Sequence, residues 1–203
     1  MTALRQTRML NHAAGAVLAA GWLLFAVIHI NKFLSGGDWS YLLFMLSETL
    51  IAVLFMLRNT PQALSHAPLD WVLAISGTFA PFLFMPGGDS LLPAGRYLIL
   101  FGMLTQIAGL LSLNSSFGLV AARRGVKTGG MYRLVRHPLY ASYLLGYVGY
   151  VLVNSSLYNL LLVSAAAALL FGRMLREERF LSHDSNYILY MRRVKYRVLP
   201  LVF

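Results

Sequence analysis

Six apolar stretches follow one another along this chain, and short polar segments separate them. They cover residues 13–30, 40–57, 70–86, 95–113, 138–153 and 157–172. A helix of about 20 apolar residues crosses the ~30 Å hydrocarbon core of a bilayer. Because the first four stretches approach that length, we predict four membrane-spanning helices.

The composition excludes a soluble globular fold. Hydrophobic residues make up 58% of the 203 residues and charged residues only 12%, whereas about 25% of the residues of a soluble domain are charged. A chain with so little polar surface is solvated by lipid, where helices satisfy their own backbone hydrogen bonds. We therefore predict an all-α fold, a polytopic transmembrane helical bundle, which forms a single integral membrane domain over residues 1–203.

The last two stretches are shorter and form a feature of their own. Each has about 16 residues, or about 24 Å of helix, and only Asn154, Ser155 and Ser156 separate them. This spacing predicts a C-terminal membrane helical hairpin. Pro138 suits the first position of its first helix, because proline has no N–H to leave unpaired there. From Arg173 onward we predict a short cytoplasmic helical tail.

Basic residues are concentrated in the C-terminal third, where 12 of the 17 lysines and arginines lie within residues 123–197. If the N-terminus is cytoplasmic, Lys32 and Arg96 are the only basic residues left outside. Basic loops stay on the cytoplasmic side and meet anionic lipid headgroups. We therefore place both termini and the loop 114–137 in the cytoplasm, at a prokaryotic inner membrane, and expect membrane lipids rather than nucleic acid as partners. In this predicted orientation, the basic residues on the cytoplasmic side also include Arg5, Arg8 and Arg58.

Two polar residues interrupt the apolar stretches. Glu48 and Gln106 lie inside predicted membrane helices, where a polar group is costly unless it faces a partner or a cavity. We consider both as substrate-binding candidates. Glu48 fits a structural role equally well, and for Gln106 an interhelical hydrogen bond is the favoured alternative.

The segment Gly129–Tyr140 is the densest group of chemically active residues. It places a glycine turn, two arginines, a histidine and two tyrosines where a helix begins. The N-terminus of a helix offers unpaired N–H groups to a carboxylate or phosphate. The alternative is an interfacial belt of snorkelling arginines and headgroup-level tyrosines. Further on, the tyrosines recur along one helix face, which fits packing or a pocket for a cation. They are Tyr140, Tyr143, Tyr147 and Tyr150.

Adjacent glutamates follow the last apolar stretch, beside several arginines. Glu177 and Glu178 fit either a solvated ion-pair network or a pair of carboxylates that holds hydroxyls or an ammonium group. Because the turn at 154–156 is tight, the hairpin must return the chain to its start. We therefore expect both glutamates to lie near His137 and Tyr140.

In their order and spacing, these residues resemble the C-terminal signature of the isoprenylcysteine carboxyl methyltransferase and phospholipid methyltransferase family. The resemblance spans roughly residues 126–200, and the earlier helices match only in general character. The matching residues are Tyr132, the run Arg136-His137-Pro138-Leu139-Tyr140, Glu177, Glu178, Leu181, Tyr187, Tyr190, Arg193, Arg197 and Pro200.

The resemblance implies an integral membrane methyltransferase that uses S-adenosylmethionine (SAM), with helices in 1–113 and the cofactor-binding and catalytic region in 114–203. It implies a lipophilic acceptor that arrives from the bilayer, at the cytoplasmic face. Methyl transfer is an in-line displacement that needs alignment and exclusion of water, and no metal is expected. The implied cofactor-binding residues are Gly130, Tyr132, Arg136, His137, Leu139, Tyr140, Glu177 and Glu178. The implied catalytic residues are Arg173, Arg176 and Glu177.

Two other functions were weighed against this one. Sterol reductases are similar in a His-Pro-x-Tyr segment and a tyrosine-rich tail but use NADPH; the Glu177-Glu178 pair and the short chain disfavour them. A non-enzymatic transporter would use Glu48 and Gln106 as a path. The concentration of polar residues at the cytoplasmic end disfavours that reading, because transporters bind substrate near mid-membrane.

Overall fold

The computed structural model describes residues 20–56, 63–65, 67–113, 122–123 and 126–202. Several features of the sequence lie outside this part of the chain, namely residues 13–19 of the first apolar stretch, Arg5, Arg8, Arg58 and Arg124. The regular elements of the described residues are helices, apart from one pair of two-residue strands, in which β1 (Ala63–Leu64) pairs antiparallel with β2 (Ala122–Arg123). The predicted all-α class is therefore confirmed in its main feature.

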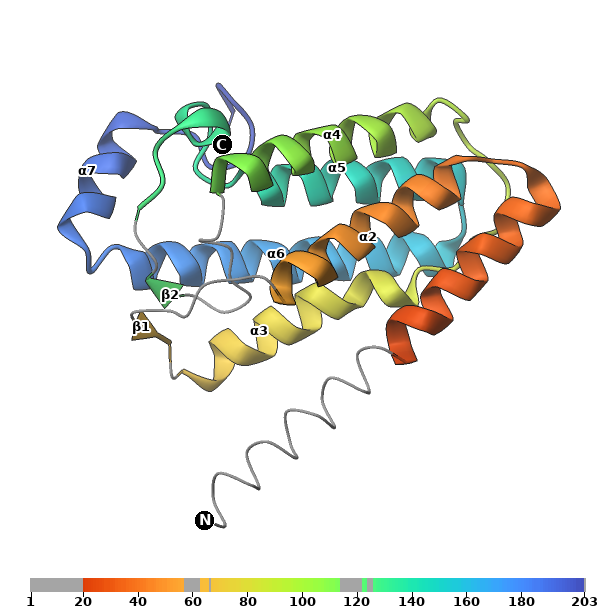
Figure 1. Cartoon of the computed structure of the whole chain (residues 1–203), viewed down its shortest axis with the longest axis horizontal. Coiled ribbons are helices and arrows are strands. Elements are labelled where there is room, and N and C mark those ends of the chain that lie inside the picture. Colours follow the sequence, from red (N-terminus) through yellow and green to blue (C-terminus); the bar gives the residue numbers. More distant parts are fainter. Residues whose placement is uncertain (1–19, 57–62, 66, 114–121, 124–125, 203) are drawn as a thin grey trace, which may run out of the picture.

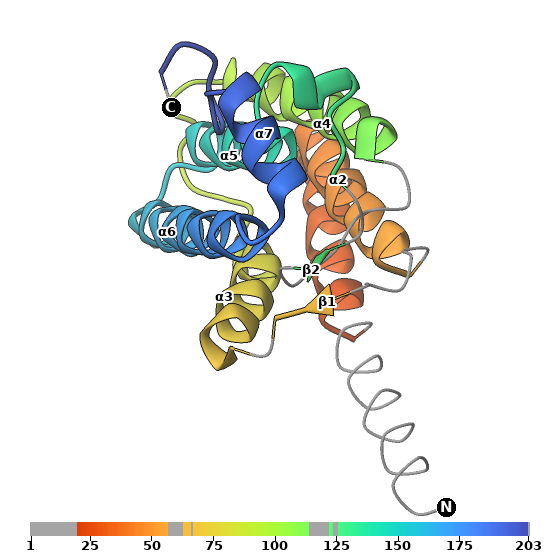
Figure 2. The ribbon, with the colours of Figure 1, turned by 90° about the vertical axis from the view of Figure 1, so that its left-hand side faces the viewer.

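The helices follow the apolar stretches in order. A helix covers Ala20–Gly36, and the elements after it are α2 (Ser40–Met56), α3 (Pro68–Phe79), η1 (Ala80–Leu83), α4 (Gly95–Leu113), η3 (Gly130–Arg133), α5 (Pro138–Val153), α6 (Leu157–Leu181) and α7 (Ser185–Arg193). Figure 1 shows α4, α5 and α6 running along the long axis of the molecule, with α2 in contact with α4 and α3 in contact with α6. The short helix α7 crosses the end of the bundle at which α6 ends (Figure 2).

The first leg of the hairpin is confirmed at its predicted bounds, but the second leg is longer than predicted. Helix α6 runs for 25 residues from Leu157 to Leu181, so the predicted helical tail does not begin with a new helix at Arg173. No proline interrupts the segment 157–181, and the helix ends at Ser182, whose N–H still bonds to the carbonyl of Glu178. The glutamates therefore stand on the same rigid helix as the apolar part of the hairpin.

The stretch predicted at 70–86 also differs. Helix α3 ends at Phe79 and continues only as the 3-10 helix η1, which has Pro81 in its first turn and ends at Leu83. Proline lacks the N–H that an α-helix would need at that position. Among the described residues, two helices are long and apolar enough to cross a membrane, Gly95–Leu113 and Leu157–Leu181.

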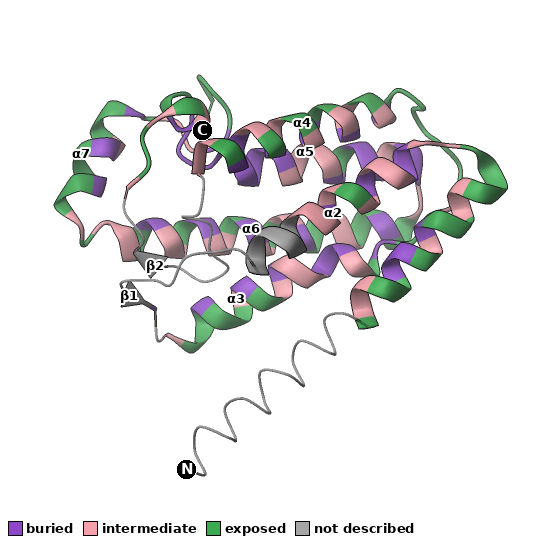
Figure 3. Ribbon diagram, in the orientation of Figure 1, coloured by how far each residue is buried: buried purple, intermediate pink, exposed green. Residues whose placement is uncertain are grey.

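The surface of the bundle is rich in apolar side chains, and its hydrophobic interior also contains polar residues. Large hydrophobic side chains recur along the exposed side of α4, at Tyr97, Phe101, Leu104 and Leu111, and Figure 3 shows exposed residues spaced along α3, α4 and α6. Buried polar residues include His29, Glu48, Gln106, Asn154 and Asn159. An extended apolar exterior of this kind marks a surface that contacts lipid or another protein, which agrees with membrane association.

Helices α4 and α5 approach each other closely because glycines line their contact. A Cβ atom at Gly95 or Gly102 would lie 2.8 Å from the carbonyl oxygen of Gly149 or 2.9 Å from that of Ser142, respectively. Small residues at a helix contact allow the backbones to approach in this way. This packing fixes where α5 presents its tyrosines.

Candidate functional site

Hydrogen bonds fix the turn between α5 and α6. The side-chain oxygen of Asn154 accepts from the Tyr41 hydroxyl and from the Gly87 N–H, both at 2.9 Å. The Ser156 hydroxyl accepts from the N–H of Asn159 at 3.1 Å and so caps α6, which is the usual role of serine at this position. The turn therefore directs α6 back toward the beginning of α5.

At the open end of the hairpin, four side chains form a buried charge cluster, the Glu178 cluster: Arg136, His137, Glu178 and Arg197. Oε1 of Glu178 accepts from Nε of Arg136 at 2.6 Å and lies 3.1 Å from Nε2 of His137. Oε2 of Glu178 accepts from Nε of Arg197 at 2.8 Å. Both carboxylate oxygens thus already have partners within the chain, and Arg136, His137 and Glu178 are buried.

The other glutamate faces different partners. The Tyr140 hydroxyl donates to Oε2 of Glu177 at 2.7 Å, and the Arg173 guanidinium carbon lies 5.5 Å from the centre of the Tyr140 ring. This distance is within the range of a cation–π contact. We call Tyr140, Arg173 and Glu177 the Tyr140 group. They join the two legs of the hairpin, so the predicted proximity of Glu177 and Tyr140 is confirmed.

The glycine turn before α5 is folded against the end of α4. Gly130 has φ = 57°, in the left-handed region, and the N–H of Met131 donates to the Ser112 hydroxyl at 3.1 Å. The carbonyl of Tyr132 accepts from the Tyr190 hydroxyl of α7 at 2.8 Å. Burial raises the pKa of the Tyr132 phenol well above its usual value, so this side chain stays neutral at physiological pH.

Arg176 and Leu139, two of the predicted site residues, make their contacts away from the Tyr140 group. Nε of Arg176 pairs with Oδ1 of Asp70 on α3, and Asp70 also accepts a hydrogen bond from the Ser65 hydroxyl. Arg176 therefore contributes to the contact between α3 and α6. Leu139 packs against Leu110 and next to Gly109 of α4, so its side chain lies in the contact between α4 and α5.

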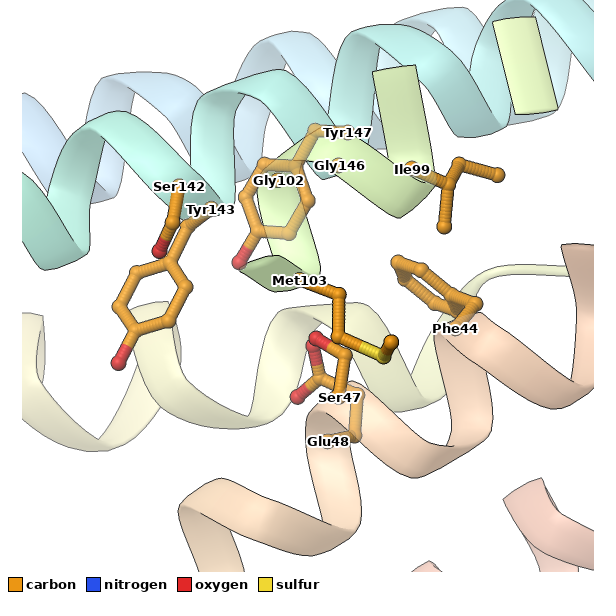
Figure 4. A pocket seen from close by; sticks show the side chains of 10 residues that line it. All are labelled: Phe44, Ser47, Glu48, Ile99, Gly102, Met103, Ser142, Tyr143, Gly146 and Tyr147. Atoms are coloured by element: carbon orange, nitrogen blue, oxygen red, sulfur yellow. The ribbon is translucent and has the colours of Figure 1, made fainter. Parts of the chain in front are cut away.

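A pocket lies between α2, α4 and α5, farther from the end of the bundle (Figure 4). Its lining comprises Phe44, Ser47, Glu48, Ile99, Gly102, Met103, Ser142, Tyr143, Gly146 and Tyr147. Glu48 is 5% exposed, and it lines this pocket. Tyr143 connects the pocket with the Tyr140 group, because its ring is perpendicular to that of Tyr140 at a centroid distance of 6.3 Å.

Gln106 does not line the pocket, and instead links two helices. Its side-chain oxygen accepts from the Ser47 hydroxyl at 2.8 Å, and its side-chain nitrogen donates to the Ser47 carbonyl at 3.1 Å. This is the interhelical bonding that the sequence favoured for Gln106.

Sequence reasoning missed several residues of these clusters. Asp70 gave no signal, because its partner Arg176 is distant in the sequence. Arg197 and Tyr190 matched the family signature, but nothing in their spacing assigned them partners. Tyr143 was part of the tyrosine face, and only its position beside Glu48 places it at the pocket.

Comparison with known proteins bears on the same region. Residues 90–184 match the sequence model of the phospholipid methyltransferase family. No curated protein matches the chain. The matched range runs from the segment before α4 to the N-terminal end of α7, and it includes the hairpin, the Tyr140 group and Glu178. The resemblance seen in the sequence is thereby confirmed over residues 90–184, just under half of the chain, which are similar to the phospholipid methyltransferase family.

Proposed function

We propose that this protein transfers a methyl group from SAM to a lipid or another lipophilic acceptor at the cytoplasmic face of the membrane. The observation that carries the proposal is the Tyr140 group. It places a carboxylate, a phenol and a guanidinium together at the open end of the hairpin, inside the domain that matches the family.

The residues around the Tyr140 group fit SAM chemically. SAM carries a positive sulfonium, an ammonium, a carboxylate and ribose hydroxyls. Glu177 offers a carboxylate for the ammonium or the hydroxyls, and the rings of Tyr140 and Tyr143 offer faces that attract a cation. Gly130, Tyr132 and His137 border this region from the turn before α5 and from the start of α5. When bound, SAM would supply the methyl group.

The contribution of the chain is to align the two reactants and to exclude water. The Tyr140–Glu177 hydrogen bond fixes the orientation of the carboxylate, and the packing of α4 on α5 holds Tyr140 and Tyr143 in place. Such preorganisation lowers the barrier of a displacement reaction because the reactants meet already oriented. Of the two predicted catalytic arginines, Arg173 is the one next to Tyr140, so we assign it, and not Arg176, to the site.

We propose that the reacting end of the acceptor enters the pocket lined by Glu48, Tyr143 and Tyr147. Tyr143 takes part in both the pocket and the ring contact with Tyr140. An acceptor in the pocket would therefore lie beside the proposed cofactor site. Gln106, which bonds to Ser47 on the wall of this pocket, would support the pocket without touching the acceptor.

We further propose that the protein is multi-pass, with both termini on the cytoplasmic side of a prokaryotic inner membrane. The distribution of charge supports this orientation. Arg133, Arg179, Arg192 and Lys195 belong to the end of the bundle that carries α7, whereas Arg96 stands at the start of α4, at the opposite end. Basic residues collect on the cytoplasmic side of membrane proteins.

The test is ligand binding by the purified protein in detergent. Thermal stability is measured with SAM, with its demethylated product and with NADPH. Stabilisation by SAM and its product, but not by NADPH, is expected, because a ligand that binds only the folded state raises its stability. Labelled methyl donor is then incubated with the protein and a membrane-lipid extract, and mass spectrometry identifies the methylated lipid. Absence of both stabilisation by SAM and label transfer would overturn the proposal.

A further inference from the structure

The segment after α6 returns to the open end of the hairpin and is held there along its length. We call α7 together with residues 194–198 the C-terminal strap. Arg136 binds it with side chain and backbone: Nη1 donates to the carbonyls of Val194 at 2.8 Å and Lys195 at 2.7 Å, and the backbone N–H donates to the carbonyl of Tyr196 at 2.9 Å. The N–H of the next residue, His137, donates to the carbonyl of Arg197 at 2.8 Å.

Glu178 closes this arrangement from the second leg of the hairpin. It holds Arg136 with one carboxylate oxygen and Arg197 of the strap with the other. Arg136 thus connects three parts of the chain that are distant in sequence: the start of α5, the end of α6 and the strap. A buried carboxylate and guanidinium whose hydrogen bonds are all made within the protein specify one arrangement, because the loss of either partner leaves a buried charge unpaired.

A second set of contacts joins the strap to the glycine turn. The Tyr190 hydroxyl donates to the carbonyl of Tyr132, and the side chains of Tyr132, Tyr187, Tyr190 and Val194 form a buried apolar cluster. The strap therefore contacts the turn before α5 at Tyr132 and again at Arg136 and His137. The backbone between these contacts is the segment to which the proposed function assigns cofactor binding.

From these contacts we infer that the C-terminal strap shapes the cofactor site, and that Arg136 and Glu178 are positioning residues which hold the strap rather than ligands of SAM. The inference rests on the proposed function for the identity of the cofactor. It separates the adjacent glutamates: Glu177 belongs to the site, while Glu178 acts on Tyr132 through the strap and contacts His137 directly, with Oε1 3.1 Å from Nε2.

The experiment exploits the lack of cysteine in this chain. Leu189 of α7 is 60% exposed, so Leu189→Cys provides a single position for a spin label on the strap. The mobility of the label and the Kd for SAM are measured in this background for Glu178→Gln, Arg136→Lys and Tyr190→Phe. Tyr190→Phe removes one hydroxyl and keeps the ring, so it is expected to fold even where Glu178→Gln and Arg136→Lys do not. Glu177→Gln serves as the comparison inside the site, and Arg192→Gln removes an exposed charge from the strap as the control.

A mobile component of the spin-label spectrum is expected in Glu178→Gln, Arg136→Lys and Tyr190→Phe, which we call the latch variants because each removes a contact of the strap. In Glu178→Gln and Arg136→Lys, SAM binding is expected to weaken about tenfold or more, because the first removes the carboxylate charge and the second removes the guanidinium hydrogen bonds. Glu177→Gln should weaken SAM binding without mobilising the label, and Arg192→Gln should change neither property. Weaker SAM binding by Glu178→Gln with an immobile label would show that Glu178 acts on the site by a route other than the strap and would overturn the inference. An immobile label in all three latch variants would overturn it as well.

Failure of the proposed function has a different signature. If the unsubstituted protein does not bind SAM, the cofactor assignment fails, while the label still reports whether Arg136, Glu178 and Tyr190 hold the strap.

Discussion

The hydroxyl of Tyr140 donates a hydrogen bond of 2.7 Å to Oε2 of Glu177, which lies 37 residues away on the other leg of the hairpin. This bond links α5 directly to the proposed cofactor site on α6 and orients the Glu177 carboxylate. Its loss and the loss of the carboxylate charge can be separated experimentally.

Substitution Glu177→Gln is expected to weaken SAM binding about tenfold or more, because the negative charge available to the ammonium of the cofactor is lost. Tyr140→Phe keeps the charge and removes only the orienting hydroxyl, so its effect should be smaller. Calorimetry gives both Kd values, and thermal melting of each variant checks the fold. If both variants bind SAM as tightly as the unsubstituted protein, the assignment of the site is wrong.

Substitution Gly130→Ala is expected to disrupt the turn before α5. The left-handed conformation costs a non-glycine residue about 1–2 kcal/mol, and the added Cβ would lie 2.2 Å from the Ser112 hydroxyl oxygen. The neighbouring Gly129→Ala is the matched control, since Gly129 has φ = −98° and no atom within 4 Å of an added Cβ. Chemical or thermal denaturation should show a lower stability for Gly130→Ala only. Equal stability of the two variants would contradict the turn geometry.

Substitution Gly149→Ala tests the contact between α4 and α5. An added Cβ would lie 2.6 Å from the carbonyl oxygen of Gly95, and backbone cannot yield as a flexible side chain does. Overpacking of this kind typically costs about 1–3 kcal/mol. Gly146→Ala adds the same methyl group where no atom lies within 4 Å, so its melting temperature should stay near that of the unsubstituted protein. A Gly149→Ala variant that melts no lower than Gly146→Ala would refute the close approach.

Substitution Arg176→Gln distinguishes the two arginines once assigned to catalysis. Arg176 pairs with the buried carboxylate of Asp70, so its loss should lower stability by about 1–3 kcal/mol, as expected for a buried group left without its partner. Its SAM affinity and turnover should change little. Arg173→Gln, next to Tyr140, should reduce turnover much more than stability. Steady-state kinetics and thermal melting of both variants test this assignment. If Arg176→Gln lost turnover and Arg173→Gln lost only stability, Arg176 would be the arginine of the site.

Substitution Glu48→Gln examines the pocket between α2, α4 and α5. Because Glu48 lines the proposed acceptor pocket and not the cofactor site, the KM for the acceptor should rise while the Kd for SAM is unchanged. Gln106→Leu is the companion variant: it removes the bonds to Ser47 and should lower stability more than acceptor affinity. A parallel loss of SAM affinity in Glu48→Gln would mean that the pocket and the cofactor site are one.

The sequence alone was sufficient to predict the structure wherever a single local feature determines it. The bounds of α4 and α5 follow from the lengths of their apolar runs, and Pro138 marks the start of α5. The tight turn at 154–156 brought Glu177 and Glu178 to the start of α5 by connectivity alone. The spacing of Tyr132, the run 136–140 and the glutamates led to the family that the match over 90–184 confirmed.

Where the local sequence allows two structures equally well, contacts between segments distant in the sequence determine which one forms. The apolar run ends at 172, yet α6 continues to Leu181, because its arginines and glutamates find partners on α3, on α5 and in the C-terminal strap. Adjacent carboxylates look alike in the sequence, but successive helical residues point about 100° apart, so Glu177 meets Tyr140 while Glu178 meets Arg136 and Arg197. Hydropathy and motif order thus define the hairpin and its family, and the three-dimensional contacts assign a separate task to each of its charged residues.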